Sequence, residues 1–298
     1  MRSEYKAEII YGDTDSLMMR FPHIPRKELW EHCYFMEKEL VDSRVFPYPM
    51  KFDFEQKIFA QFMILTKKKY MYKCLDRATD TIIPKIENKG VLLARRDNSE
   101  FIRRIYEKTV VDLFDKKPYE NILFDIQQDV LNCFRRQFPQ SDFIITKSVK
   151  DIAEYKVKEL SDDPEKRQKR FDRLLCSADS YNLRCLPAHV QLATLIRSRG
   201  IRVDSGQRIE YVVVKTNGGT DLLADRIEAS DYQQKFSAIV PIDYFYYIKA
   251  LCVPLDQLLQ VVFKSDKLFT AIFKYFLGYA RVVDEIKKMG MGKINLIQ

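Results

Sequence analysis

Two aspartates separated by a single residue are the most informative chemical feature of this 298-residue chain. Asp13 and Asp15 lie in the hexapeptide Tyr11-Gly12-Asp13-Thr14-Asp15-Ser16. Strand-forming residues flank the hexapeptide and Gly12 permits a tight bend, so the pattern predicts a β-hairpin with both acids at its tip. Carboxylate oxygens suit Mg²⁺, and two such ions can stabilise the attacking and leaving oxygens of a phosphoryl transfer. Asp and Gly are also common in simple turns, which is the alternative interpretation.

The elements predicted to hold the hairpin are a helix and a sheet. Apolar side chains recur at helical spacing over about residues 27–43, which predicts an amphipathic helix. Residues 51–62 and 63–75 alternate in polarity and are predicted to be two strands packed on that helix. Beyond residue 95 the pattern is mainly helical. It predicts helices at 100–114, 119–138 and about 256–289, strands at 143–148 and 211–215, and a turn at 217–219.

Composition bounds the class of protein without identifying it. The chain is long enough for two domains, and 46% hydrophobic residues allow a substantial core. Lys and Arg number 50 against 42 Asp and Glu, and this basic excess favours contact with phosphate backbones. The dense charges of residues 156–173 fit a solvated face at least as well as such a contact. Six scattered cysteines without a Cys-x-x-Cys pair give no zinc or cluster site.

The hexapeptide is identical in sequence to motif C of the family B DNA polymerases, and other segments resemble further motifs of that family in the required order. Lys67-Lys68-Lys69-Tyr70 resembles its Lys-Lys-Arg-Tyr motif, with Lys69 in place of Arg, which keeps the charge but loses the planar fork. The resemblance covers nearly the whole chain. The remaining segments that resemble the family are 52–57, 89–97, 187–193, 206–212, and 243–247 followed by Pro254.

The resemblance implies an α+β fold in two parts. Residues 1–93 would form the C-terminal part of a polymerase palm, an antiparallel β-sheet with packed helices, and residues 94–298 a mainly helical thumb. The exonuclease domain, the palm motif with the other principal metal-binding Asp, and the fingers helix of a complete family member have no counterpart in the sequence. We therefore expect the C-terminal portion of a polymerase, either a fragment or one product of a split gene. The motif strings resemble delta-type enzymes and those of large nucleocytoplasmic DNA viruses, and favour the virus.

By the same resemblance, the aspartates would be the catalytic and metal-binding residues. Asp15 would be the main ligand of two Mg²⁺ ions, and Asp13 would act beside it, mainly through its charge. The Lys-rich segment would contact the minor groove near the primer terminus, although a lysine triplet can also protect an exposed strand edge. The arginines near residue 95 can instead pair with Asp97, and the tyrosine pair near residue 246 can be packing. The DNA-binding residues expected are Lys67, Lys68, Lys69, Tyr70, Lys89, Arg95, Arg96, His189, Tyr246 and Tyr247.

The implied activity is template-directed addition of dNMP to a primer 3′-hydroxyl, by an enzyme whose missing half must be supplied. The expected partners are primer–template DNA, dNTP and that N-terminal half, while no clean clamp-binding box for a processivity factor is present. No organic cofactor is expected. The absence of a secretory signal or a membrane-length apolar run predicts an intracellular protein, in the nucleus or at a cytoplasmic site of viral replication. A DNA-binding accessory module and a nonfunctional gene fragment are the alternatives.

Overall fold

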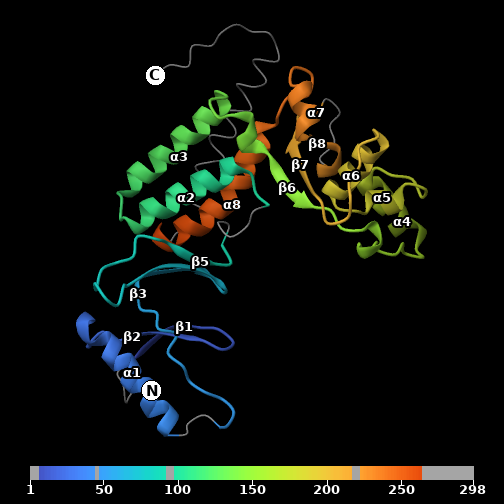
Figure 1. Ribbon diagram of the computed structural model, residues 1–298. Coiled ribbons are helices and arrows are strands. Elements are labelled where there is room, and N and C mark those ends of the chain that lie inside the picture. The colour runs from blue at the N-terminus through green and yellow to red at the C-terminus, as the bar shows by residue number, and fades with distance from the viewer. Residues whose placement is uncertain (1–6, 44–46, 92–96, 217–221, 264–298) are drawn as a thin grey trace. The chain divides into compact units, whose positions relative to one another are not determined.

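The computed structural model describes residues 7–43, 47–91, 97–216 and 222–263 (Figure 1). The chain divides into two compact units, residues 1–94 and residues 95–298. Each unit combines helices with small antiparallel sheets, so the α+β class predicted from the sequence is confirmed. Within the described ranges no helix is long and apolar enough to cross a membrane.

The first unit begins with the predicted hairpin. Strands β1 (Glu8–Gly12) and β2 (Leu17–Arg20) pair antiparallel, with a bulge between Ile9 and Tyr11. A 3₁₀ turn, η1 (Arg26–Glu28), leads into α1 (Leu29–Asp42), which confirms the predicted amphipathic helix. A second sheet has the order β3-β4-β5. Its strands are β3 (Phe59–Thr66), β4 (Lys69–Cys74) and β5 (Glu87–Lys89).

The predicted strand boundary between residues 62 and 63 is wrong. Strand β3 continues through this point to Thr66, because all its residues up to 65 are partly buried, and the turn falls on the exposed pair Lys67-Lys68. The strand predicted from residue 51 also begins later, at Phe59. Before it, the Phe54 backbone N–H donates to a Glu37 carboxylate oxygen (2.9 Å), and the Phe54 ring packs edge-on against Trp30 of α1.

An aromatic cluster joins the hairpin to the second sheet. Its buried centre is Tyr70, Tyr72 and Cys74 on β4. Tyr11 of β1 packs against this centre, with its ring centroid 5.6 Å from that of Tyr70. Burial of large aromatic side chains in mutual contact is a strong source of packing energy. The hairpin is therefore held on the sheet by the residue that precedes its Gly-Asp turn. The other partly buried side chains of the cluster are Met18, Phe59, Phe62 and Ile64.

In its described residues the second unit is built around three long helices and one sheet, and Phe101, Phe143 and Tyr247 are fully buried in it. Its sheet has the order β6-β7-β8. Its elements are α2 (Glu100–Phe114), α3 (Tyr119–Phe134), η3 (Gln140–Phe143), β6 (Ile145–Ser148), η4 (Ile152–Glu154), α4 (Pro164–Leu174), α5 (Tyr181–Arg184), α6 (Ala188–Ser198), β7 (Arg208–Val213), η5 (Leu223–Asp225), β8 (Ile227–Ala229), α7 (Ser230–Lys235) and α8 (Tyr244–Phe263).

Most predicted elements of the second unit are confirmed, with shifted ends. The helix predicted at 100–114 is α2 itself. Helix α3 ends at Phe134 instead of 138, because Arg136 adopts a left-handed conformation (φ 57°). The strand predicted at 211–215 starts earlier, at Arg208, and the last helix starts at Tyr244. The predicted turn at 217–219 and the helix beyond 263 lie outside the described residues. Helix α4, in the charged segment, buries none of its side chains.

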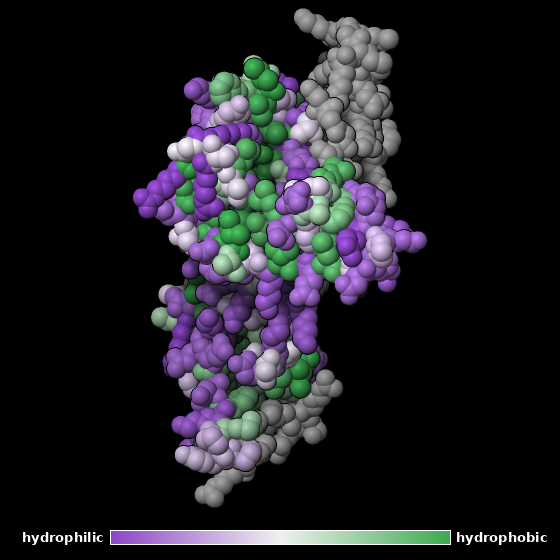
Figure 2. Space-filling model, turned by 90° about the vertical axis from the view of Figure 1, so that its right-hand side faces the viewer, coloured by the Kyte–Doolittle hydropathy of each residue, from purple (hydrophilic) through white to green (hydrophobic). Residues whose placement is uncertain are grey.

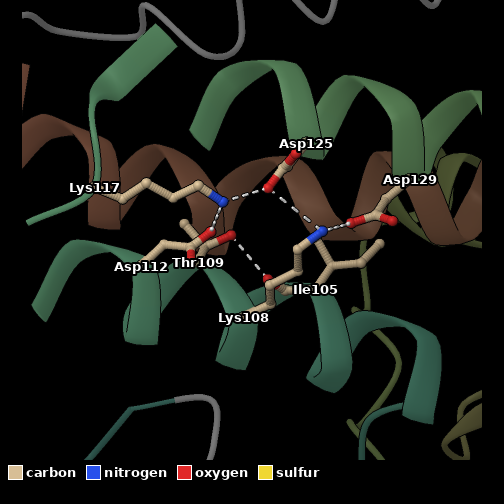
Figure 3. A network of polar contacts seen from close by, with 7 residues as sticks. All are labelled: Ile105, Lys108, Thr109, Asp112, Lys117, Asp125 and Asp129. Carbon is tan, nitrogen blue, oxygen red and sulfur yellow. Dashed lines mark hydrogen bonds and ion pairs between the residues drawn. The ribbon is translucent and has the colours of Figure 1, made fainter. Parts of the chain in front are cut away.

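A ladder of ion pairs holds α2 against α3 (Figure 3). The Lys117 ammonium, in the connection between the helices, lies 2.6 Å from Asp125 of α3 and 3.2 Å from Asp112 of α2. Lys108 of α2 lies 3.2 Å from Asp129 and 3.7 Å from Asp125. The hydrogen bond from Lys117 lowers the pKa of Asp125, which keeps this shared carboxylate charged. The ladder therefore links α2, the connection after it and α3 through charged side chains.

On the face shown in Figure 2, hydrophilic and hydrophobic residues are interspersed. Among the exposed hydrophobic side chains are Ile9 and Ile10 of β1 and Leu17 of β2. The hairpin that carries the two acids is thus a surface element, and its tip is accessible to a ligand.

Candidate functional site

The turn that carries the two acids is closed by its own backbone. The Asp13 N–H donates to the Ser16 carbonyl oxygen (2.9 Å), and the Thr14 N–H donates to an Asp13 carboxylate oxygen (2.9 Å). The predicted hairpin with both acids at its tip is confirmed. The two acids differ in their surroundings, because Asp15 is exposed whereas the Asp13 side chain is only 20% exposed.

Asp13 forms an ion pair with Lys68, which lies 55 residues further along the chain. The Lys68 ammonium donates to the Asp13 carboxylate at 2.7 Å. This hydrogen bond, helped by the bond from the Thr14 N–H, holds the pKa of Asp13 below its usual value of 3.8. The same contact raises the pKa of Lys68. Both groups therefore stay charged at neutral pH, and the Lys68 side chain remains 60% exposed.

The backbone of Lys68 is also fixed. Its N–H donates to the Tyr11 hydroxyl (2.9 Å), and its φ of 64° places it in the left-handed region. On the other side, Gly90 (φ 68°) approaches so closely that a Cβ at this position would lie 2.1 Å from the Lys68 carbonyl oxygen. The structure thus brings together the Asp-Thr-Asp tip, the Lys-rich turn and the Lys-Gly segment. Tyr11 and Gly90 were not among the predicted site residues, although both lie within motif segments.

The other predicted residues of the first unit surround this contact. Lys67 is exposed in the same turn as Lys68, so neither lysine is on a strand as the sequence suggested, and Lys69 begins β4. Lys89 of β5 pairs in register with Tyr70, and its ammonium lies 5.9 Å from the Tyr70 ring centroid. Tyr70 is only 4% exposed. The burial of Tyr70 favours a packing role over a direct DNA contact, because its ring lies against Tyr11 and Lys89.

The predicted residues of the second unit form no comparable cluster within the described ranges. Arg95 and Arg96 lie outside those ranges. His189 is half-buried near the start of α6, and burial, aided by the positive charge of Lys147, lowers its pKa, so it is neutral at neutral pH. Tyr246 is half-buried, and its ring centroid lies 6.0 Å from the Arg226 guanidinium.

A direct DNA contact by Tyr247 does not agree with the structure. Tyr247 is fully buried, and its hydroxyl accepts a hydrogen bond from the Val213 N–H (2.8 Å). Its ring also packs edge-on against Phe143, with the centroids 5.1 Å apart. The packing alternative is therefore favoured for the second tyrosine of the pair.

The hairpin tip fits the chemistry of a divalent cation in part. Both candidate ligands are carboxylates, which are the hard oxygen donors that Mg²⁺ prefers. Across the described part of the chain, however, no group of three or more His, Cys, Asp or Glu residues is gathered as a metal site. The tip thus offers two charged ligands of the right kind, and a complete metal site would require others.

The hairpin tip thus combines two carboxylates with an exposed lysine, which are groups of the kind that contact divalent cations and phosphates respectively. The sequence matches the family model described as DNA polymerase family B over residues 1–262. The chain therefore belongs to DNA polymerase family B, which confirms the predicted resemblance.

Similar proteins come from viruses and from yeast. The chain is 35% identical to "DNA polymerase 120R" of Invertebrate iridescent virus 3, over 89% of this chain and 25% of the relative. It is 33% identical to "Putative DNA polymerase 060R" of Frog virus 3 (isolate Goorha), over 96% of this chain and 31% of the relative. The chain is 26% identical to the "DNA polymerase delta catalytic subunit" of Candida albicans, over 88% of this chain and 22% of the relative. The chain thus spans between 22% and 31% of the length of these relatives.

Proposed function

We propose that this chain is the C-terminal portion of a DNA-directed DNA polymerase that adds dNMP from dNTP to a primer 3′-hydroxyl. Residues 1–93 are assigned to the palm and residues 94–298 to the thumb. The division of the chain into compact units between residues 94 and 95 supports this boundary. The rest of the polymerase polypeptide, which relatives carry within one longer sequence, is the proposed partner, together with primer–template DNA.

The observation that carries the proposal is the 2.7 Å contact between Lys68 and Asp13. A polymerase must hold the end of a duplex without reading its sequence, so it should contact phosphates and the minor-groove acceptors that every base pair offers. An exposed ammonium can make such contacts. Because Lys68 lies directly beside the acids, a primer end bound by this lysine would be held next to the catalytic carboxylates.

The two acids have different proposed roles. Asp15 and Asp13 would hold Mg²⁺, which when bound stabilises the charge that develops during phosphoryl transfer. Asp15 is exposed and suited to direct ligation, while Asp13 is engaged by Lys68 and contributes its negative charge. Asp13 thereby orients the lysine that receives the primer. Positioning and charge stabilisation are the main contributions of a protein to this class of reaction.

Further contacts belong to the same proposal. Lys67, in the same turn as Lys68, and Lys89, at the end of β5, would add positive charge for the DNA, and Arg95 and Arg96 would contact phosphates at the passage from palm to thumb. His189 and Tyr246 are assigned supporting positions near the DNA. The protein would act where the DNA is replicated, in the nucleus or at a cytoplasmic site of viral replication, and a processivity factor is proposed as a further partner.

A chimeric polymerase tests the function. Residues 1–298 would replace the matching segment of the Invertebrate iridescent virus 3 polymerase, and primer extension would be measured with Mg²⁺ and dNTP. We expect extension by the chimera and none by the same chimera carrying Asp15→Asn. A folded chimera that binds primer–template but extends no primer would favour a DNA-binding accessory module. A chimera that neither binds nor extends would favour a nonfunctional fragment.

A further inference from the structure

We propose that Tyr11 is a positioning residue for Lys68. Its hydroxyl accepts the Lys68 backbone N–H and so fixes the turn from which the Lys68 ammonium reaches Asp13. In the assembled enzyme, the fixed turn would hold the Lys68 ammonium where it can contact the end of the primer. The DNA-binding part of this inference rests on the proposed polymerase function, whereas the effect of Tyr11 on the turn does not.

The Lys67-Lys68 turn needs such a support. Lys68 adopts a φ of 64°, a conformation that residues other than glycine rarely adopt because the side chain crowds its own backbone. Both lysines of the turn are exposed, so burial of their side chains does not hold them in place. A hydrogen bond from the hairpin to the strained residue itself therefore stabilises one conformation of the turn.

Tyr11 can serve as a fixed acceptor because its own position is determined by packing. It lies in β1, paired in register with Met18 of β2. Its ring packs on the buried Tyr70 ring at 5.6 Å between centroids, tilted by 55°. The hydroxyl therefore projects from an anchored ring, not from a free surface side chain, and its direction is set by the core of the first unit.

Lys68 is then held at three points by three different segments. Its N–H is bound by Tyr11, its carbonyl oxygen lies against Gly90, and its ammonium is bound by Asp13. The contacts with Tyr11 and Gly90 fix the backbone of Lys68. The fixed backbone directs the Lys68 side chain toward Asp13, where its ammonium forms the third contact. Loss of the Tyr11 hydroxyl should free the turn while leaving the acids in place.

The first test needs no DNA. In the purified 298-residue chain, Tyr11→Phe keeps the ring and removes only the acceptor, and hydrogen exchange at the Lys68 amide is followed by NMR together with the Lys68 ammonium signal. We expect amide exchange to accelerate by up to about tenfold, as for loss of one hydrogen bond in a locally opening segment, and the ammonium signal to change. Tyr72→Phe is the matched control, because its hydroxyl in the same cluster donates to Glu87 (2.9 Å) instead. Unchanged exchange at Lys68 in Tyr11→Phe would overturn the proposal.

The second test is a double-mutant cycle on primer–template affinity with Tyr11→Phe and Lys68→Ala. If Tyr11 acts through Lys68, Tyr11→Phe weakens binding several-fold in the native background and adds nothing to Lys68→Ala. Equal weakening in both backgrounds would show that Tyr11 does not act through this lysine and would overturn the proposal. If Lys68→Ala itself leaves affinity unchanged while the exchange effect is present, the proposed DNA contact fails, and only the support of the turn by Tyr11 stands.

Discussion

Gly90 lies directly against the carbonyl oxygen of Lys68, at a place where a Cβ would come within 2.1 Å of that oxygen. The neighbouring atom is backbone, so it cannot move aside as the end of a flexible side chain would. The absence of a side chain at residue 90 is therefore what lets β5 end beside the Lys-rich turn.

Gly90→Ala is expected to destabilise the first unit. The positive φ of 68° alone costs about 1–2 kcal/mol for alanine, and the overlap with Lys68 adds to it. Trp30, the single tryptophan, lies in this unit, so its fluorescence during denaturation reports the change. Gly200→Ala in the second unit is the control, because φ there is 83° but no atom lies within 4 Å. A Trp30 transition no more affected by Gly90→Ala than by the control would contradict the importance of the close approach.

The isolated chain is expected to bind duplex DNA weakly and without sequence preference. Binding should fall steeply as salt rises, because each phosphate contact releases counterions. Lys67→Ala and Lys68→Ala should each reduce the slope of log affinity against log salt by about 1. Lys38→Ala, an exposed lysine on α1, is the control and should leave the slope unchanged. Fluorescence anisotropy over a salt series measures all three, and an affinity insensitive to salt would count against the assignment.

The same isolated chain is expected not to extend a primer. The hairpin tip supplies two carboxylates, and within the described ranges no third His, Cys, Asp or Glu joins them in a metal site. Two carboxylates on one turn are too few ligands to fix two ions. Incubation of the purified chain with primer–template, Mg²⁺ and dNTP tests this expectation, and extension sensitive to Asp15→Asn would show that the chain is active alone.

In the chimeric polymerase, the two aspartates should respond differently to replacement. Asp15→Ala should abolish extension and leave DNA affinity unchanged or slightly higher, because a ligand is lost and repulsion of phosphate is relieved. Asp13→Ala should be damaging but less so, and Lys68→Ala should speed dissociation of the primer end. Single-turnover extension and dissociation rates separate these effects. Near-normal turnover by Asp15→Ala would refute the metal-binding role of the hairpin tip.

Stability should depend on the protonation of His189. Burial and the nearby charge of Lys147 lower the pKa of His189 in the folded protein below 6.5, so the unfolded chain takes up the proton first as pH falls. The free energy of unfolding should then decrease as pH drops through about 6.5, until the folded pKa is reached. His189→Gln should remove this part of the pH dependence. Denaturant unfolding at about pH 7.5 and pH 5.5 compares the two proteins, and an identical pH dependence would contradict the prediction.

The hairpin tip was predictable because its determinants are local. Strand-forming residues, Gly12 and the acids lie within one short segment, so their pattern alone indicates the turn. The contact between Asp13 and Lys68 was not predictable in this way, because it depends on where the β3–β4 turn falls. The partly buried residues of β3 continue to Leu65, so the turn falls on Lys67 and Lys68. The alternation of polarity in the sequence instead predicted a boundary between residues 62 and 63.

Burial explains the remaining differences. Tyr246 and Tyr247 are adjacent and chemically identical, yet only Tyr247 is fully buried, because α8 turns that side toward β7 and η3. A helix presents consecutive residues at different angles, so one member of a pair can be core and the other partly exposed. The sequence of the motif does not show which of the two tyrosines is buried, because that depends on the elements that pack against α8.

Tyr11, near the end of β1, and Asp13, in the turn that follows Gly12, both reach the same residue, Lys68. Gly12 is the single residue between them, so the backbone at this point sets the separation and the relative direction of the two side chains. A single-residue insertion or deletion at Gly12 would therefore separate the two contacts, even if every chemical group were kept. The hexapeptide should accept some substitutions between these residues, but no change in its length.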